Sequence, residues 1–434
     1  MQSFEYIRKL NSDYAFATMN PLKAKVPGRG PYCFRIHGQI YHRMNIALYP
    51  DIGETPSHCH LFIIDPEEAI KNVKQPNMNI DEEMLKKICK ILHENNPFVE
   101  GLEMMVDEEK KQKEIAQLLG REPYEVKLFL TDSKNLDKRV YNLPRVNEVS
   151  AVFVCDSEGN IPEPRIVIRE KGKELKIINC NCAETDPLLY PLFLPKGTKQ
   201  WHPDLKKKNG KRVSRSEYVK YRLALKKDTY NPFILGRKLF QQYCVDQYVR
   251  VENDRMKYIR DHQKEICAES YFELESWIND DEIGNKKFKK IVLPSSVTGS
   301  PRYIEQNYQD AMAMVRRFGK PDYFLTMTCN PNWPEIKDNL LPGQTPNDRP
   351  DLIVKVFRMY MKNLIYEVTK KEIFGKLKAW IYVVEFQKRG LPHIHLLMTM
   401  KKDDKIRSPK DVDRFINATL KTDDSEAFEL IKNT

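Results

Sequence analysis

Apolar residues in the C-terminal part of the chain recur at two spacings. The period of two, or a continuous β-branched and aromatic run, predicts strands at 322–329, 379–386 and 393–400. Lys-Arg-Gly-Leu-Pro separates the last two strands and supplies turn residues, so these strands should form a hairpin. Helical spacing predicts helices at 303–318, 350–372 and 409–421. We therefore expect an antiparallel sheet with helices on one face, which is an α+β fold.

The preceding part of the chain has a mixed pattern. Aromatic and β-branched stretches broken by Pro and Gly predict strands within 29–66, and helical spacing predicts helices at 82–95 and 106–119. A basic loop at about 196–215 is a candidate subdivision. A long helical pattern over 233–263 has an apolar stripe formed by Phe240, Cys244, Tyr248, Val251 and Tyr258. We expect this stripe to be a core or interdomain contact, with a DNA-reading helix as the less favoured alternative.

We place a domain boundary between 265 and 292. Polar residues and Gly284 break the helical pattern there, before a strand-like segment at 290–293. The prediction is a mixed α/β N-terminal region at 1–280 and a second domain at 285–434. A length of 434 residues with 41% hydrophobic content allows two or three packed domains.

The composition favours an anionic partner inside the cell. The net charge is +11, so the surface should attract phosphate in a salt-dependent way. The basic runs at 206–212 and 286–290 are more simply solvated loops, with a phosphate track or nuclear-import signal as the alternative. The start of the chain has no apolar core of signal-peptide length, and no run approaches a membrane span. Nine scattered cysteines fit a reducing compartment.

The hairpin carries a candidate metal site. His393 and His395 should share one face of their strand, and a turn centred near Arg389 sets Glu385 opposite His393. Gln387 is a candidate fourth ligand. Two imidazoles and a carboxylate with open positions suit Mn²⁺ or Mg²⁺, whereas structural zinc more often recruits thiolates.

Residues around the triad are candidate DNA contacts. Lys388 and Arg389 lie at the hairpin tip, where we expect them to contact phosphate. Asn330 follows the strand at 322–329, and Thr326 and Thr328 alternate on one face of it. For these threonines two interpretations stay open, contacts to DNA or to the metal ligands, and ordinary polar positions on a half-exposed strand.

Two other pairs of metal-ligand residues are interpreted as incidental. His58 and His60 repeat the spacing of the histidine pair, but they follow a Gly-Glu-Thr-Pro-Ser loop and lack a facing carboxylate strand. Cys180 and Cys182 have no second cysteine pair at zinc-site spacing.

The motif F-L-T-x-T-x-N-P at 324–331, followed by E-F-Q-K-R-G-x-P-H-x-H at 385–395, resembles the Rep nuclease of Helitron rolling-circle transposons, an HUH endonuclease. Further segments resemble the region that Helitron proteins carry ahead of the nuclease: 30–42, 93–98, 190–195, 236–243, 293–296 and 301–312. The resemblance extends from about residue 29 to about residue 400.

The resemblance implies a function. A divalent metal held by Glu385, His393 and His395 would assist nicking and strand transfer of single-stranded DNA at transposon ends, in the nucleus. In the family a pair of tyrosines in a Y-x-x-K-Y-like pattern attacks the DNA, and a helicase region follows. No such pattern occurs after His395, and no phosphate-binding G-x-x-x-x-G-K-[ST] loop occurs anywhere. We therefore expect a partial HUH domain that lacks the catalytic tyrosines, uses no ATP and is inactive alone.

Tyr360 and Tyr366 lie within the predicted helix at 350–372 but are six residues apart. Tyr360 falls on the apolar stripe of that helix, so we expect it to pack in the core rather than to attack DNA. Two alternatives from other classes remain. One is a non-catalytic DNA-binding remnant of a transposon. The other is an unrelated metalloenzyme, although in a cupin-like oxygenase the glutamate ligand would normally follow the histidines.

Overall fold

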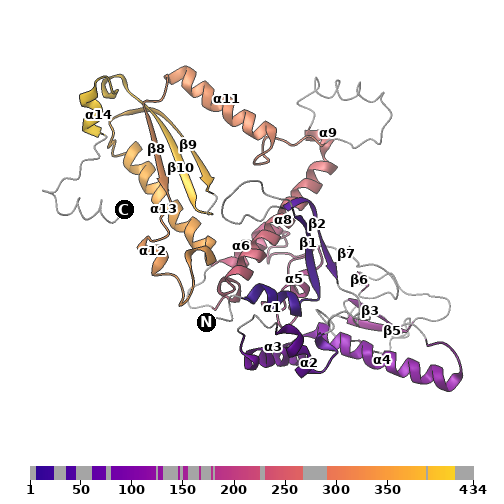
Figure 1. Cartoon of the computed structure of the whole chain (residues 1–434). Coiled ribbons are helices and arrows are strands. Elements are labelled where there is room, and N and C mark those ends of the chain that lie inside the picture. Colours follow the sequence, from indigo (N-terminus) through magenta and orange to yellow (C-terminus); the bar gives the residue numbers. More distant parts are fainter. Residues whose placement is uncertain are drawn as a thin grey trace. The chain divides into compact units, whose positions relative to one another are not determined.

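The computed structural model (Figure 1) describes residues 6–23, 36–44, 61–74, 80–123, 126–130, 145–146, 150–154, 166–167, 177–178, 181–224, 230–266, 291–387 and 390–415. The chain divides into two compact units, Met1–Tyr258 and Ile259–Thr434. The structure combines helices with antiparallel sheets, so the predicted α+β class is confirmed at that level. Among the described residues, no helix is long and apolar enough to cross a membrane.

The first unit begins with helices packed around one core. They are α1 (Ile7–Tyr14), α2 (Pro66–Val73), α3 (Glu82–Asn95) and α4 (Pro97–Leu119). The bounds predicted for α3 are confirmed. The predicted start of the next helix at 106 is wrong, because Asn96 caps the N–H of Phe98 and Pro97 fits the first helical turn. The core contains Leu85, Leu92 and Val99 among its buried side chains.

Two small sheets belong to this unit, and their neighbouring strands pair antiparallel. One has the order β1-β2-β7, with bounds Ala17–Lys23, Ile36–Met44 and Ile177–Ile178. The other has the order β4-β5-β3-β6, with bounds Arg145–Val146, Ser150–Val154, Val126–Leu130 and Ile166–Val167. Strand β2 lies in the region predicted to hold strands, but residues 61–64 do not form a strand and Pro66 begins a helix. His58 and His60 lie outside the described residues.

The remaining helices of the first unit are α5 (Thr185–Leu189), α6 (Arg215–Leu223), α7 (Pro232–Leu235) and α8 (Lys238–Asp261), the last of which extends past the boundary to the second unit. The prediction of one continuous helix over 233–263 is therefore wrong, because two helices, α7 and α8, cover most of this range. The two helices are separated at Gly236 and Arg237, and Arg237 takes a positive φ of 47°. The predicted apolar stripe is only partly buried, because Phe240 is in the core whereas Tyr248 and Tyr258 are exposed.

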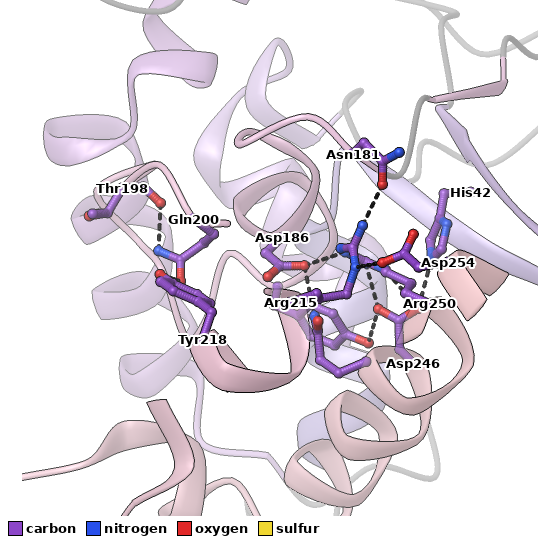
Figure 2. Close-up of polar contacts among 12 residues, drawn as sticks. His42, Asn181, Asp186, Thr198, Gln200, Arg215, Tyr218, Asp246, Arg250 and Asp254 are labelled. Atoms are coloured by element: carbon purple, nitrogen blue, oxygen red, sulfur yellow. Dashed lines mark hydrogen bonds and ion pairs between the residues drawn. The ribbon is translucent and has the colours of Figure 1, made fainter. Parts of the chain in front are cut away.

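The buried face of α8 includes polar side chains that bond to one another and to groups outside the helix (Figure 2). Arg250 donates from Nη1 to Asp186 Oδ1 at 2.6 Å and from Nη2 to Asp246 Oδ2 at 2.6 Å. His42 Nε2, from β2, lies 2.7 Å from Asp246 Oδ1. Tyr190 donates its hydroxyl to Asp246 Oδ2, and Gln247 donates to Asp186. These groups join three segments that are distant in sequence: β2, the α5 region and α8.

The charges in this network stabilise one another. Burial alone raises the pKa of Asp246, but Arg250 and His42 outweigh burial and hold this pKa well below its ordinary value. Burial lowers the pKa of Arg250, but the two aspartates outweigh burial and raise it. Because both charged forms are paired and hydrogen-bonded, the network is compatible with a buried position. Residues of the segments 30–42 and 190–195 thus contribute to packing in this unit.

The second unit contains the sheet that was predicted from the hydrophobic pattern. After α9 (Gln263–Ile266) come α11 (Pro301–Phe318), β8 (Tyr323–Thr328), α12 (Pro334–Lys337), α13 (Pro350–Thr369), β9 (Leu377–Phe386), β10 (Pro392–Met400) and α14 (Pro409–Phe415). Single 3₁₀ turns occur at Pro346–Asp348 and Lys402–Asp404. The described part of the predicted strand at 290–293 is not a strand. Instead, the backbone N–H and C=O of Val292 bond to the side chain of Gln263.

The sheet has the order β8-β10-β9, and both pairings are antiparallel. Strand β10 is central, so it has a neighbouring strand on each side. Its Ile394 and Leu396 are buried, and Ile394 shares a core cluster with Val356 and Phe357 of α13. One face of the sheet thus packs on α13, and the alternation of β10 turns the histidines to the other face.

Candidate metal centre

The hairpin of β9 and β10 places two histidines and a glutamate on one face. His393 pairs with Glu385 across the hairpin, as the turn position predicted, and His395 pairs with Val383. On the other side of β10, His393 pairs with Thr328 and His395 with Thr326. Residues that pair directly across antiparallel strands have side chains on the same face. All six side chains therefore share the face opposite α13.

The potential ligand atoms of Glu385, His393 and His395 lie within 4.8 Å of one another. His395 Nε2 donates to Glu385 Oε1 at 2.9 Å, and the two imidazole rings are 4.5 Å apart between centroids. Burial increases across the triad: the Glu385 side chain is exposed, His395 is half-buried and His393 is buried. The donors therefore converge at the surface of the sheet, where an ion and a substrate could both reach them.

A hydrogen bond orients one imidazole of the triad. Thr328 Oγ1 lies 2.6 Å from His393 Nδ1. With Nδ1 engaged by the hydroxyl, Nε2 is the nitrogen left to bind a cation. Partners of this kind hold a metal-binding imidazole in one tautomer and one ring orientation. Thr328 therefore contacts a predicted ligand, as one of its two interpretations proposed.

The donor set fits a divalent cation. Adjacent ligands of an octahedral ion with bonds of about 2.1 Å are about 3 Å apart. Glu385 Oε1 and His395 Nε2 have that separation, and the whole set lies within 4.8 Å. Two neutral imidazoles and one carboxylate would leave a bound divalent ion with residual positive charge, which favours a phosphate oxygen as a further ligand.

The structure accounts for some other predicted residues and leaves others as predictions. The N–H of Gln387 donates to the carbonyl of Leu391 at 2.9 Å, which closes the hairpin, and its role as a fourth ligand stays a prediction. Lys388 and Arg389 lie outside the described residues. Asn330 accepts from the N–H of Asn332 through its side chain, so it shapes the turn after β8. The DNA contacts predicted for Thr326 and Asn330 also stay predictions.

Tyr360 packs on the helix side of the second unit. Its ring stacks on Trp333 with centroids 4.0 Å apart, and its hydroxyl donates to both carboxylate oxygens of Glu335. Burial and the bond to Glu335 raise the pKa of Tyr360. A raised pKa makes a hydroxyl less available as a nucleophile at neutral pH, so these contacts support the packing role.

One side chain beside the triad was missed in the sequence. Phe324 of β8 stacks on His395 with ring centroids 5.3 Å apart and an angle of 5° between the rings. It belongs to the motif that carries the family resemblance, but no role was predicted for it. Its place in the alternation with Thr326 and Thr328 was the available signal, since all three must share one face.

The second unit is thus an antiparallel sheet with a helix on one face and a metal-compatible triad on the other. Residues 218–398 match a family described as Helitron helicase-like domain at N-terminus. This part of the chain is therefore Helitron-related, and a transposase-related role is indicated. The match includes α8, β8, β9, most of β10 and the complete triad. A search of curated proteins gave no match.

Proposed function

We propose that the second unit is an HUH-type endonuclease domain that binds a divalent metal and single-stranded DNA during rolling-circle transposition. The convergence of Glu385, His393 and His395 on the open face of the sheet is the single observation that carries this proposal. The domain would begin at about residue 285 and would work with the helicase region of a full-length protein. We expect the transposon ends to be the substrate and the nucleus to be the site of action.

In this proposal each residue has a defined task. The imidazoles of His393 and His395 and the carboxylate of Glu385 would hold Mn²⁺ or Mg²⁺, with Gln387 as a candidate further ligand. Thr328 would keep His393 in the tautomer that presents Nε2. Lys388 and Arg389 would contact phosphates that flank the reacting one. When bound, the divalent ion would polarise the scissile phosphate and stabilise the charge of the transition state.

The nucleophile would be a tyrosine, as the family resemblance implies. Its hydroxyl would lose its proton and form a bond to phosphorus, the bond from phosphorus to the 3′ oxygen would break, and that oxygen would leave as a 3′-hydroxyl. The product would be a 5′-phosphotyrosine. We assign this role to none of the described residues. Tyr360, the tyrosine weighed for it above, is engaged with Trp333 and Glu335.

Calorimetric titration of Mn²⁺ into the full chain tests the metal site. The variant His393→Ala/His395→Ala should lose binding, because it removes two of three ligands. The matched control is His58→Ala/His60→Ala, which makes the same change in the other His-x-His triplet and should bind like the unmodified chain. Titration in the presence of a single-stranded oligonucleotide should give tighter Mn²⁺ binding, since the two ligands would share the ion.

Equal Mn²⁺ binding by the unmodified chain and by His393→Ala/His395→Ala would reject the metal centre. A DNA-binding protein without metal chemistry would then be the better interpretation, supported by the Helitron relation and by a net charge of +11.

A further inference from the structure

Phe324 is exposed on the face of the sheet that carries the triad. Its relative accessibility is 63%, although it is a large apolar side chain in the middle of a strand. One face of the ring lies against His395, at a centroid distance of 5.3 Å. The high accessibility means that other parts of the ring remain available for contact. A solitary exposed apolar residue needs no explanation, but its parallel stacking beside a ligand set does.

The surroundings of Phe324 are also open. Thr326 and Thr328 on the same face of β8 are exposed, as are Val383 and Glu385 on β9. The central β10 residues between them are half-buried or buried by these neighbours. Among the described residues, this face therefore presents the Phe324 ring, two threonines, Val383 and the triad. Proteins that bind single strands on sheets use exposed aromatic side chains in this way, because every base has a π-face that can stack.

We propose that Phe324 is a base-stacking residue that positions single-stranded DNA on the triad. A nucleobase would stack on the ring, and a phosphate of a neighbouring nucleotide would reach the ligand set, since the Phe324 ring lies only 5.3 Å from the ring of His395. His395 connects the stacking residue to the ligand set, because it stacks on Phe324 and contributes a ligand atom. Stacking of this kind tolerates any base, so Phe324 would fix position rather than sequence.

This proposal rests on the proposed function, and the test separates the two. Fluorescence anisotropy of an oligothymidylate of about 12 nucleotides, a length within the range of single-strand sites, measures DNA binding to the full chain with Mn²⁺ present. Phe324→Leu should weaken binding roughly 5- to 150-fold, the range for loss of one base–aromatic stack. Phe324→Trp should bind the oligonucleotide about as tightly as the unmodified chain, because the indole offers a stacking surface at least as large.

Phe386→Leu is a matched control. Phe386 has a relative accessibility of 62%, but it follows Glu385 on β9 and so points to the opposite face. This variant should bind DNA like the unmodified chain. Oligonucleotides with one abasic site at successive positions supply a second measurement. At one position the missing base should weaken binding by the unmodified chain but cause no further loss for Phe324→Leu, because the same stack cannot be lost twice.

The stacking role would be overturned if Phe324→Leu bound DNA as tightly as the unmodified chain. Loss of DNA binding together with loss of Mn²⁺ binding by this variant would also overturn it, since Phe324 would then act by holding His395. Retained Mn²⁺ binding with weakened DNA binding supports it. Failure of the metal centre itself is detected separately, by the calorimetric comparison of the histidine variants.

Discussion

Arg250 gives the most direct test of how the first unit is held together. Its side chain is buried and bonds to two aspartates at 2.6 Å each. Arg250→Met keeps the apolar stem and removes the guanidinium. Asp246 would retain His42 and Tyr190 as partners, but no cation among the described residues would pair with Asp186. Breaking one side of a buried pair leaves an uncompensated charge and costs about 3–5 kcal/mol.

A cost of that size is a large part of a domain's stability, which is about 5–15 kcal/mol. The assay is urea unfolding followed by the fluorescence of Trp201, which lies in the first unit and donates to the carbonyl of Val213. Replacing Trp277, Trp333 and Trp380 with Phe in every variant makes Trp201 the sole tryptophan signal. We expect a markedly lower unfolding midpoint for Arg250→Met with little change in the slope.

The control is Lys9→Met, which breaks a partly exposed pair with Asp13 whose Nζ and Oδ2 are 2.8 Å apart. Such a pair contributes below about 1 kcal/mol. Arg250→Lys should fall between the two, because one ammonium cannot reproduce the forked contacts to both aspartates. A loss below about 1 kcal/mol for Arg250→Met would refute the reasoning, since it would mean that the two aspartates are readily hydrated when the cation is removed.

Three further predictions follow from single contacts. Thr328→Val should weaken Mn²⁺ binding in calorimetry by about 10- to 100-fold, because it removes the group that orients His393, and Thr328→Ser should restore binding; equal affinities would refute this role. Asp246 has a lowered folded-state pKa, so its contribution to stability should be present above the ordinary carboxyl value of about 4 and be lost as pH falls through the lower folded value. Asp246→Asn should flatten the dependence of urea midpoints on pH in that acid range, and an unchanged slope would contradict it. Gly236→Ala should destabilise the first unit by about 1–3 kcal/mol, because its added Cβ would lie 2.4 Å from the ring of Phe193, and an unchanged urea midpoint would show that the ring moves away freely.

The sequence determined the triad hairpin well. Residues 379–400 combine two apolar runs with a short turn, and the period of two then determines which side chains share a face. The pairing of His393 with Glu385 and the common face of the histidines were therefore available without coordinates, and the structure has both. The same local rules predicted α3, whose cap Asp81 lies directly before its first turn.

Only the tertiary structure decided which contacts those elements make. The order β8-β10-β9 brings Thr328 and Phe324 to the histidines, whereas alternation within β8 gives their common face but not their neighbours. The buried face of α8 is a second example of contacts that local sequence patterns did not predict. Hydrophobic spacing favoured Tyr248, which is exposed, over Asp246, whose partner His42 is far away in the sequence. A polar residue can be buried when distant groups balance its charge and hydrogen bonds, and such partners meet only after the chain has folded.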